Sequence, residues 1–164
     1  MSLTIDIVRE SQLWDAEPAA EAVIERAVAA ALAVGRLDHV PAAELSVVLT
    51  DDAGIARLNG QWRQKDRPTN VLSFPAAPPH AVAAAPLIGD IVLAHETIAR
   101  EAAADTVSFD DHLAHLAVHG LLHLFGYDHL DDDEAETMER LETKILADLG
   151  IADPYADRPL SIAS

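Results

Sequence analysis

The order of the apolar patterns most constrains how this chain of 164 residues can fold. Strand-like patterns fall within the first 94 residues, at 3–8, 44–50, 71–74 and 87–94. Helical spacing of apolar residues is found at 18–34, 51–62, 95–104 and 132–149, and in the histidine-rich segment that Ser108 and Asp111 begin with a capping-box pattern. We therefore expect an α+β fold in one domain, residues 1–164, with one mixed β-sheet of about four strands covered by helices.

The composition limits both the compartment and the chemistry. The chain has no cysteine, which rules out disulfides and thiolate zinc sites and leaves histidine and carboxylate as the strong metal ligands. The N-terminal stretch "MSLTIDIVRE" is too charged for a signal peptide, and no apolar run approaches the roughly 18 residues of a membrane span. We expect a cytoplasmic protein without a membrane partner.

The net charge of −17, with only eleven Lys and Arg residues, argues against a general polyanion binder. Four of the eleven basic residues lie close together in "RLNGQWRQKDR": Arg57, Arg63, Lys65 and Arg67. They form one local positive patch, which is either a solvated helix end or a phosphate-binding surface.

The segment "HLAVHGLLHLFGYDH", residues 115–129, holds four of the eight histidines. On a helix, His112, His115, His119 and His123 fall within an arc of about 80°. His119 and His123, four residues apart, have the spacing with which one helix presents two nitrogen ligands to one metal ion. For His112 and His115, which lie outside that pattern, a structural or supporting role is favoured.

Gly126 follows His123 by three residues, where a left-handed turn would end the helix and reverse the chain. That reversal would return His129 toward the other two histidines and complete a three-histidine site with an open fourth position, as in catalytic zinc sites. Tyr127 and Asp128, inside the turn, are candidates for orienting ligands or water. The alternative is a stack of histidines that cap helix ends or titrate.

The spacing H-x-x-x-H-x-x-G-x-x-H is that of a class of zinc proteases, but there a glutamate follows the first histidine and here that position is Gly120. Gly120 cannot act as a general base, which disfavours a protease unless Asp128 substitutes. Phosphodiester cleavage instead needs a cation that stabilises the phosphate oxygens, and Arg63 could supply it. For RNA, the 2′-hydroxyl of the substrate is a further candidate nucleophile.

Three motifs, "LNGQWRQKDRPTNVLSFP", "GDIVLA" and "HGLLHLFGYDH", resemble in order and approximate spacing the YbeY family of bacterial rRNA maturation factors, which are metal-dependent endoribonucleases. The resemblance spans residues 45–146. It implies that His119, His123 and His129 hold one zinc ion per chain, and that Arg63 and His119 are catalytic. It also implies an α+β fold with the metal in a cleft beside the sheet.

The family resemblance further implies a substrate and partners: single-stranded RNA, in particular the 16S rRNA precursor, and the small ribosomal subunit, with no DNA expected. Docking to the ribosomal subunit would offset the charge of the chain. Trp62 stands where the family often has Tyr, and packing is favoured over base stacking. Asn70 stands where some members have Asp, so no general-base role is assigned to it.

Two other functions remain open from the sequence. One is a zinc hydrolase of peptides or amides, and the other is a ribosome-assembly factor whose metal is structural and which binds RNA without cutting it. Asp131 to Asp133 are expected to cap the last helix rather than to form a second metal site.

Overall fold

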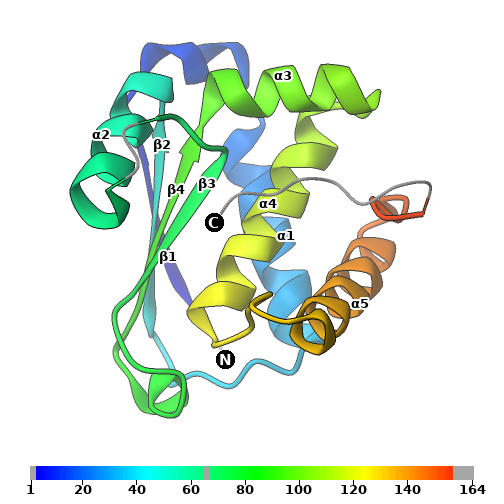
Figure 1. Ribbon diagram of the computed structural model, residues 1–164. Helices are drawn as coiled ribbons and strands as arrows, with labels where there is room; N and C mark the ends of the chain where they lie inside the picture. The colour runs from blue at the N-terminus through cyan, green and yellow to red at the C-terminus, as the bar shows by residue number, and fades with distance from the viewer. Residues whose placement is uncertain (1–2, 65–66, 157–164) are drawn as a thin grey trace.

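The computed structural model describes residues 3–64 and 67–156, which form a four-stranded sheet and the helices around it (Figure 1). The sheet order is β1 (Thr4–Arg9), β2 (Glu44–Thr50), β4 (Leu87–Ala94) and β3 (Val71–Pro75). The first three strands are parallel, and β3 runs antiparallel to β4 at one edge. The predicted α+β fold with one mixed sheet of about four strands is confirmed.

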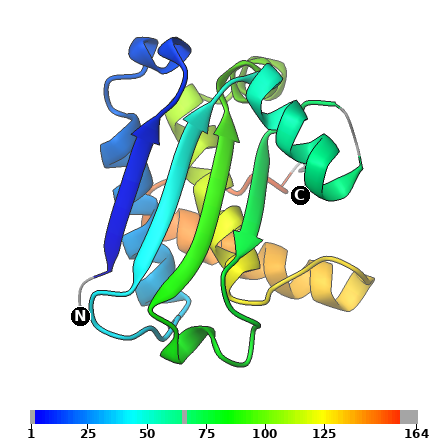
Figure 2. The same ribbon diagram turned by 90° about the vertical axis from the view of Figure 1, so that its left-hand side faces the viewer.

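The helices cover the two faces of the sheet unequally (Figures 1 and 2). They are α1 (Ala20–Val34), α2 (Asp52–Arg63), α3 (His95–Asp105), α4 (Phe109–Leu124) and α5 (Asp132–Asp148), with 3-10 turns η1 (Gln12–Ala16) and η2 (Val82–Ala84). The large core cluster lies between one sheet face and α1, α4 and α5. A smaller cluster of Ile55, Leu72, Val92 and Ala94 packs α2 against the other face.

Helix α4 is the central element of the large core, since twelve of its sixteen residues are buried. Gly120 allows it to approach the sheet closely, because a Cβ atom there would lie 3.1 Å from Ile91 Cγ2 and 3.2 Å from Ser73 Oγ. Ser73 on β3 also donates a hydrogen bond of 2.9 Å to the carbonyl oxygen of Gly120. The end of α4 that carries the metal-ligand candidates is thus fixed against the edge strand β3.

The local signals at the helix starts are present as the sequence indicates. Ser108 Oγ accepts from the backbone N–H of Asp111 at 3.0 Å, and Asp131 caps α5 through the N–H of Glu134 at 2.8 Å. The two 3-10 turns were not predicted: η1 buries Trp14 completely, and η2 buries Val82 in the connection between β3 and β4. Among the described residues, no helix is both long and apolar enough to cross a membrane.

Candidate active site

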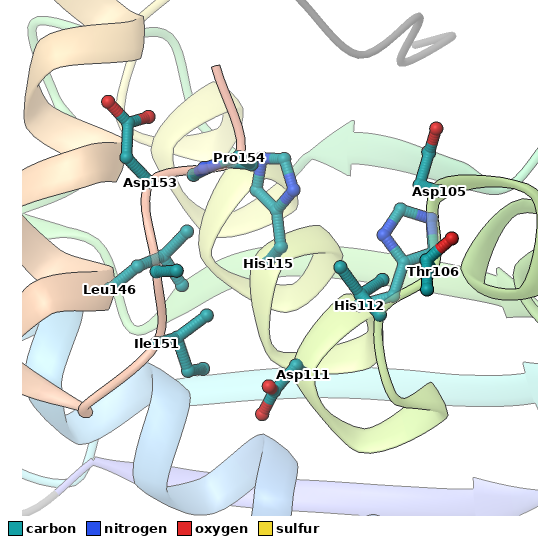
Figure 3. A pocket seen from close by; sticks show the side chains of 11 residues that line it. Asp105, Thr106, Asp111, His112, His115, Leu146, Ile151, Asp153 and Pro154 are labelled. Atoms are coloured by element: carbon teal, nitrogen blue, oxygen red, sulfur yellow. The ribbon is translucent and has the colours of Figure 1, made fainter. Parts of the chain in front are cut away.

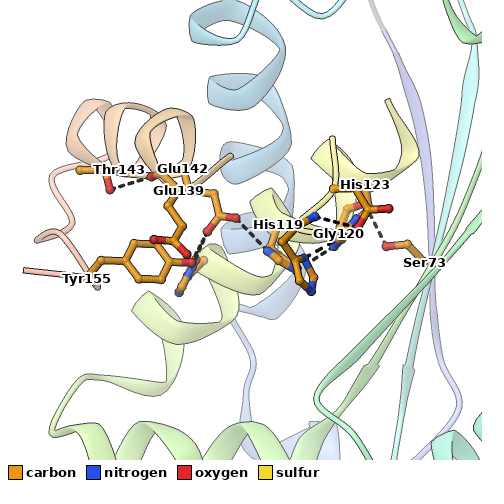
Figure 4. Close-up of polar contacts among 11 residues, drawn as sticks. Ser73, His119, Gly120, His123, Glu139, Glu142, Thr143 and Tyr155 are labelled. Atoms are coloured by element: carbon orange, nitrogen blue, oxygen red, sulfur yellow. Dashed lines mark hydrogen bonds and ion pairs between the residues drawn. The ribbon is translucent and has the colours of Figure 1, made fainter. Parts of the chain in front are cut away.

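Three imidazoles meet where α4 ends. His119 and His123 lie one turn apart on α4, and the chain then reverses at Gly126, whose φ of +98° is in the left-handed region that glycine favours. That reversal brings His129 back, so that one ring nitrogen from each of the three histidines lies within 4.8 Å of the other two. The predicted convergence of His119, His123 and His129 is therefore present in the structure; Figure 4 shows the first two side by side.

A buried carboxylate orients the first of these rings. Glu142 of α5 is fully buried, and its Oε2 accepts a hydrogen bond of 2.8 Å from His119 Nδ1 (Figure 4). Burial alone would raise the pKa of Glu142, but hydrogen bonds from His115 and His119 outweigh it and lower the pKa to about 2. Because an ionised carboxylate only accepts, His119 Nδ1 carries the proton and Nε2 presents a lone pair to the other two rings.

The donor set suits a metal ion that prefers imidazole. His119 Nε2 and His123 Nε2 face each other at 3.0 Å, close to the roughly 3.4 Å between two nitrogens that share one tetrahedral zinc. Burial, followed by the nearby His119, lowers the pKa of His123 to about 4, so its ring is neutral at pH 7 and can ligate. The three residues can hold a metal ion, and zinc fits them.

The remaining two histidines of α4 face away from this centre. His112 Nε2 bonds Glu101 of α3 at 2.8 Å, and His115 Nε2 bonds Glu142 at 2.9 Å. Both rings line a separate cavity of about 300 Å³ between α3, α4 and the chain after α5 (Figure 3). The four-histidine face is thus divided between two places, and the supporting role expected for His115 agrees with its bond to the carboxylate that also holds His119.

Two further side chains, Tyr155 and His115, hold Glu142 in place. The Tyr155 hydroxyl donates to Glu142 Oε1 at 2.6 Å, and burial together with the Glu142 charge raises the pKa of Tyr155, which keeps it a donor. Burial lowers the pKa of His115, which therefore stays neutral while it donates to the same oxygen. Glu142 consequently has three donors, and its oxygen toward His119 is held in place.

A cleft of about 490 Å³ opens beside the three histidines, and Arg63 lies on its wall. The lining comes from α2, β3, loop 76–86 and the turn after α4: Arg63, Leu72, Ser73, Phe74, Pro75, Pro79, His123, Gly126, Tyr127, Asp128, His129 and Leu130. The structure thus brings together a half-buried guanidinium, two of the three imidazoles and the Asp128 carboxylate, from segments about sixty residues apart in sequence. This arrangement can bind an anionic group next to a metal ion.

Comparisons with known proteins bear on the family of this chain. A family model described as "Endoribonuclease YbeY" matches residues 7–150. A protein of Bradyrhizobium diazoefficiens with that name is 56% identical, with 94% of this chain and 86% of the relative covered. One of the same name from Rhizobium meliloti is 53% identical, with 96% of this chain and 98% of the relative covered.

The chain belongs to the Endoribonuclease YbeY family.

A solved structure supports the family fold. The solution structure of a Thermotoga maritima protein matches with a TM-score of 0.58 and 23% identity, covering 90% of this chain and 92% of that one. At that identity the likeness speaks for the fold alone. The family resemblance read from the three sequence motifs is confirmed by the family model and by the two named relatives.

The other residues singled out in the family motif lie in different surroundings. Arg57, on α2 with Arg63, is exposed and does not line the cleft, while Lys65 lies outside the described residues. Asn70 is buried and donates to Glu101 at 2.9 Å, which is a structural role. Trp62 is 70% exposed and meets only the edge of the cleft through Phe74, so the packing expected for it is slight.

Sequence reasoning missed Glu142. The buried face of α5 consists of Met138, Glu142, Ile145 and Leu146, so that one charged residue lies among three apolar ones. The signal in the sequence was the position of Glu142, four residues after Met138 on the apolar face of the helix. A charged residue is rarely buried without a partner, so this position predicts a buried partner for Glu142.

Proposed function

We propose that this chain is a zinc-dependent, single-strand-specific endoribonuclease that acts in 16S rRNA 3′-end maturation and ribosome quality control. We take residues 1–164 as one such domain. The observation that carries the proposal is the cleft in which Arg63 lies beside His123 and His129. The names of the relatives, Endoribonuclease YbeY, support RNA as the substrate.

Each part of the cleft has a task in phosphodiester cleavage. His119, His123 and His129 would hold the zinc ion, which would supply Lewis-acid chemistry when bound. The hydrogen bond to Glu142 holds the His119 ring in one tautomer and one orientation. Arg63 donates hydrogen bonds to the phosphate oxygens, where charge develops in the transition state.

The position of residue 120 weighs against the peptide or amide hydrolase. A Cβ at Gly120 would already lie 3.1 Å from Ile91 Cγ2, 3.2 Å from Ser73 Oγ and 3.4 Å from Val71 Cγ2 of the sheet. A general-base glutamate would therefore lack room at that position, and Asp128, which lines the cleft, is the one carboxylate among the lining residues. The phosphodiester substrate uses Arg63, for which an amide substrate has no equivalent need.

The acidic body of the protein bears on how RNA arrives. With a net charge of −17, the protein repels RNA over most of its surface, and its affinity for free RNA should be low. Docking on the small ribosomal subunit would raise the local concentration of the 16S rRNA precursor at the cleft. This proposal places the enzyme in the cytoplasm, without a DNA or membrane partner.

Cleavage of an end-labelled single-stranded RNA by the untagged protein tests the proposal. Wild type, His123→Ala and Arg63→Ala are purified identically, and Arg57→Ala is the matched control, since this arginine on the same helix lies outside the cleft lining. Wild type and Arg57→Ala should cleave, while the other two should lose activity by at least about 100-fold. If all four samples behave alike, a contaminating nuclease is responsible and the assembly-factor alternative replaces the enzyme.

A further inference from the structure

We infer that Trp62 is a stacking platform for one base of the RNA strand whose phosphate lies in the cleft. The inference rests on the proposed function and deepens it, because it assigns a nucleotide-binding residue outside the metal centre. Trp62 lies at the rim of the cleft and immediately precedes Arg63 in the sequence.

Exposure sets Trp62 apart from every other aromatic side chain. The chain has two Trp, two Tyr and three Phe residues, all within the described ranges, and only Trp62 is classed as exposed, at 70%. The other tryptophan, Trp14, is fully buried and donates its indole N–H to the Thr50 carbonyl oxygen at 2.8 Å. A single exposed apolar side chain is common on protein surfaces, so the position of this ring, rather than its exposure alone, points to a ligand.

The ring is placed where a base next to the bound phosphate would lie. Trp62 contacts Phe74 with ring centroids 6.3 Å apart and an interplanar angle of 62°. Phe74 and Arg63 both line the metal cleft. A strand held by Arg63 at one phosphate would therefore pass close to Trp62, because Phe74 contacts Trp62 and lines the same cleft as Arg63.

The segment that carries Trp62 is anchored on both sides. Asp51 caps the start of α2 through the N–H of Gly54 at 2.8 Å, and Gln64 ends the helix in a left-handed conformation. The buried Asn59 donates to the carbonyl oxygen of Arg67 at 3.0 Å, which ties the helix to the chain beyond it. A preorganised ring loses little freedom when a base stacks on it.

Stacking also suits the charge of this protein. Eleven Lys and Arg residues against 28 Asp and Glu leave few cations for phosphate contacts. Base stacking on an aromatic face needs no positive charge and tolerates any base, which is how single-strand-binding proteins hold RNA without reading its sequence. Duplex bases are stacked on each other already, so this contact also favours single strands.

Steady-state cleavage and tryptophan fluorescence test the inference together. Trp62→Ala should raise KM about 5- to 150-fold, the equivalent of about 1–3 kcal/mol per stacked base, with kcat little changed, and Trp62→Phe should restore most of it. One abasic nucleotide, moved along the RNA, should raise KM of wild type at a single position and have no further effect there in Trp62→Ala. Leu87→Ala, which removes a 52% exposed apolar side chain on β4, is the control and should behave as wild type.

Fluorescence provides a readout that does not depend on cleavage. RNA should quench the emission of wild type through Trp62 and leave Trp62→Phe, which retains only the buried Trp14, unquenched. If wild type cleaves but Trp62→Ala keeps its KM and no quenching occurs, stacking is refuted while the nuclease stands. If wild type fails to cleave yet is quenched through Trp62, the nuclease fails and stacking stands; absence of both refutes both.

Discussion

Glu142 is fully buried and accepts hydrogen bonds from His119, His115 and Tyr155. Such a carboxylate fixes the tautomer of a metal-ligating imidazole and raises its basicity. Glu142 is not one of the three candidate metal ligands, but its charge and its position both act on His119.

Replacing Glu142 by Gln keeps the shape but loses the charge and one of the acceptor oxygens. We expect zinc affinity to fall about 10- to 100-fold, the usual effect of losing such a partner, as measured by competition with a zinc chelator. Glu139→Gln is the matched control, because Glu139 lines a small cavity together with Glu142 and His119 and, among the described contacts, accepts no hydrogen bond from His119 or His115. Equal losses in both variants would mean that only the local negative charge matters.

Gly126 and Gly150 offer a comparison at the turns that end α4 and α5. Both have positive φ, +98° and +77°, so alanine is strained at each and should cost about 1–3 kcal/mol. A Cβ at Gly126 would in addition lie 2.8 Å from Pro79 Cβ, whereas at Gly150 it would meet no atom within 4 Å. Urea unfolding should therefore show a larger loss for Gly126→Ala, together with weaker zinc binding through displacement of His129.

The Gly126 comparison would fail if the two alanine variants lost the same free energy of unfolding, or if Gly126→Ala bound zinc like wild type. The first result would mean that Pro79 moves aside freely. The second would mean that His129 does not depend on this turn for its place in the site.

At the scale of elements, the contact between α4 and the sheet decides which chemistry position 120 allows. Gly120→Glu restores the glutamate of the zinc-protease pattern, but its side chain would be forced toward Ile91 and Ser73. We expect a loss of more than about 3 kcal/mol of unfolding free energy, because the carboxylate would be buried without a partner in a packed interface.

Gly120→Ala is the control for the glutamate variant. It gains about 1 kcal/mol of helix propensity against two tight contacts, with Ile91 and Ser73, and should stay within about 1 kcal/mol of wild type. Thermal unfolding measures both. A stable Gly120→Glu protein that cleaves a peptide would contradict the account and restore the hydrolase alternative.

The elements themselves were predictable to different degrees. Periodicity located all four strands and α1 to α5 to within about two residues, since each buries one face of a regular element. The turn η1 was not predictable, because it depends on the hydrogen bond from Trp14 to the Thr50 carbonyl oxygen, a contact between residues distant in sequence. The same holds for η2, where Val82 is buried by tertiary packing rather than by any local pattern.

For the whole molecule, the three histidines followed from spacing and from one glycine, because both act within fifteen residues of chain. Arg63 was a candidate for phosphate binding from its chemistry, but its place in a cleft beside the histidines did not follow from the residues, and the family resemblance alone implied a cleft beside the sheet. The cleft forms because β3, at the sheet edge, lies between the end of α2 and the end of α4, which requires the complete topology. Glu142 was missed for the same reason, since its partners lie on another helix.

The metal centre lies at the margin of the large core and is not part of it. The core consists of aliphatic side chains between the sheet and three helices, so the fold should persist without metal. This separates a catalytic metal from the structural metal of an assembly factor, whose removal would unfold the C-terminal half.

Titration of zinc into metal-depleted protein, with RNA cleavage and far-ultraviolet circular dichroism followed on the same samples, tests this account most directly. Cleavage should rise in proportion to added zinc and level off at one ion per chain, while the dichroism stays that of folded protein throughout and His123→Ala stays inactive. Cleavage that is independent of zinc would contradict the proposed mechanism, and helix content that returns only with zinc would show that the metal is structural.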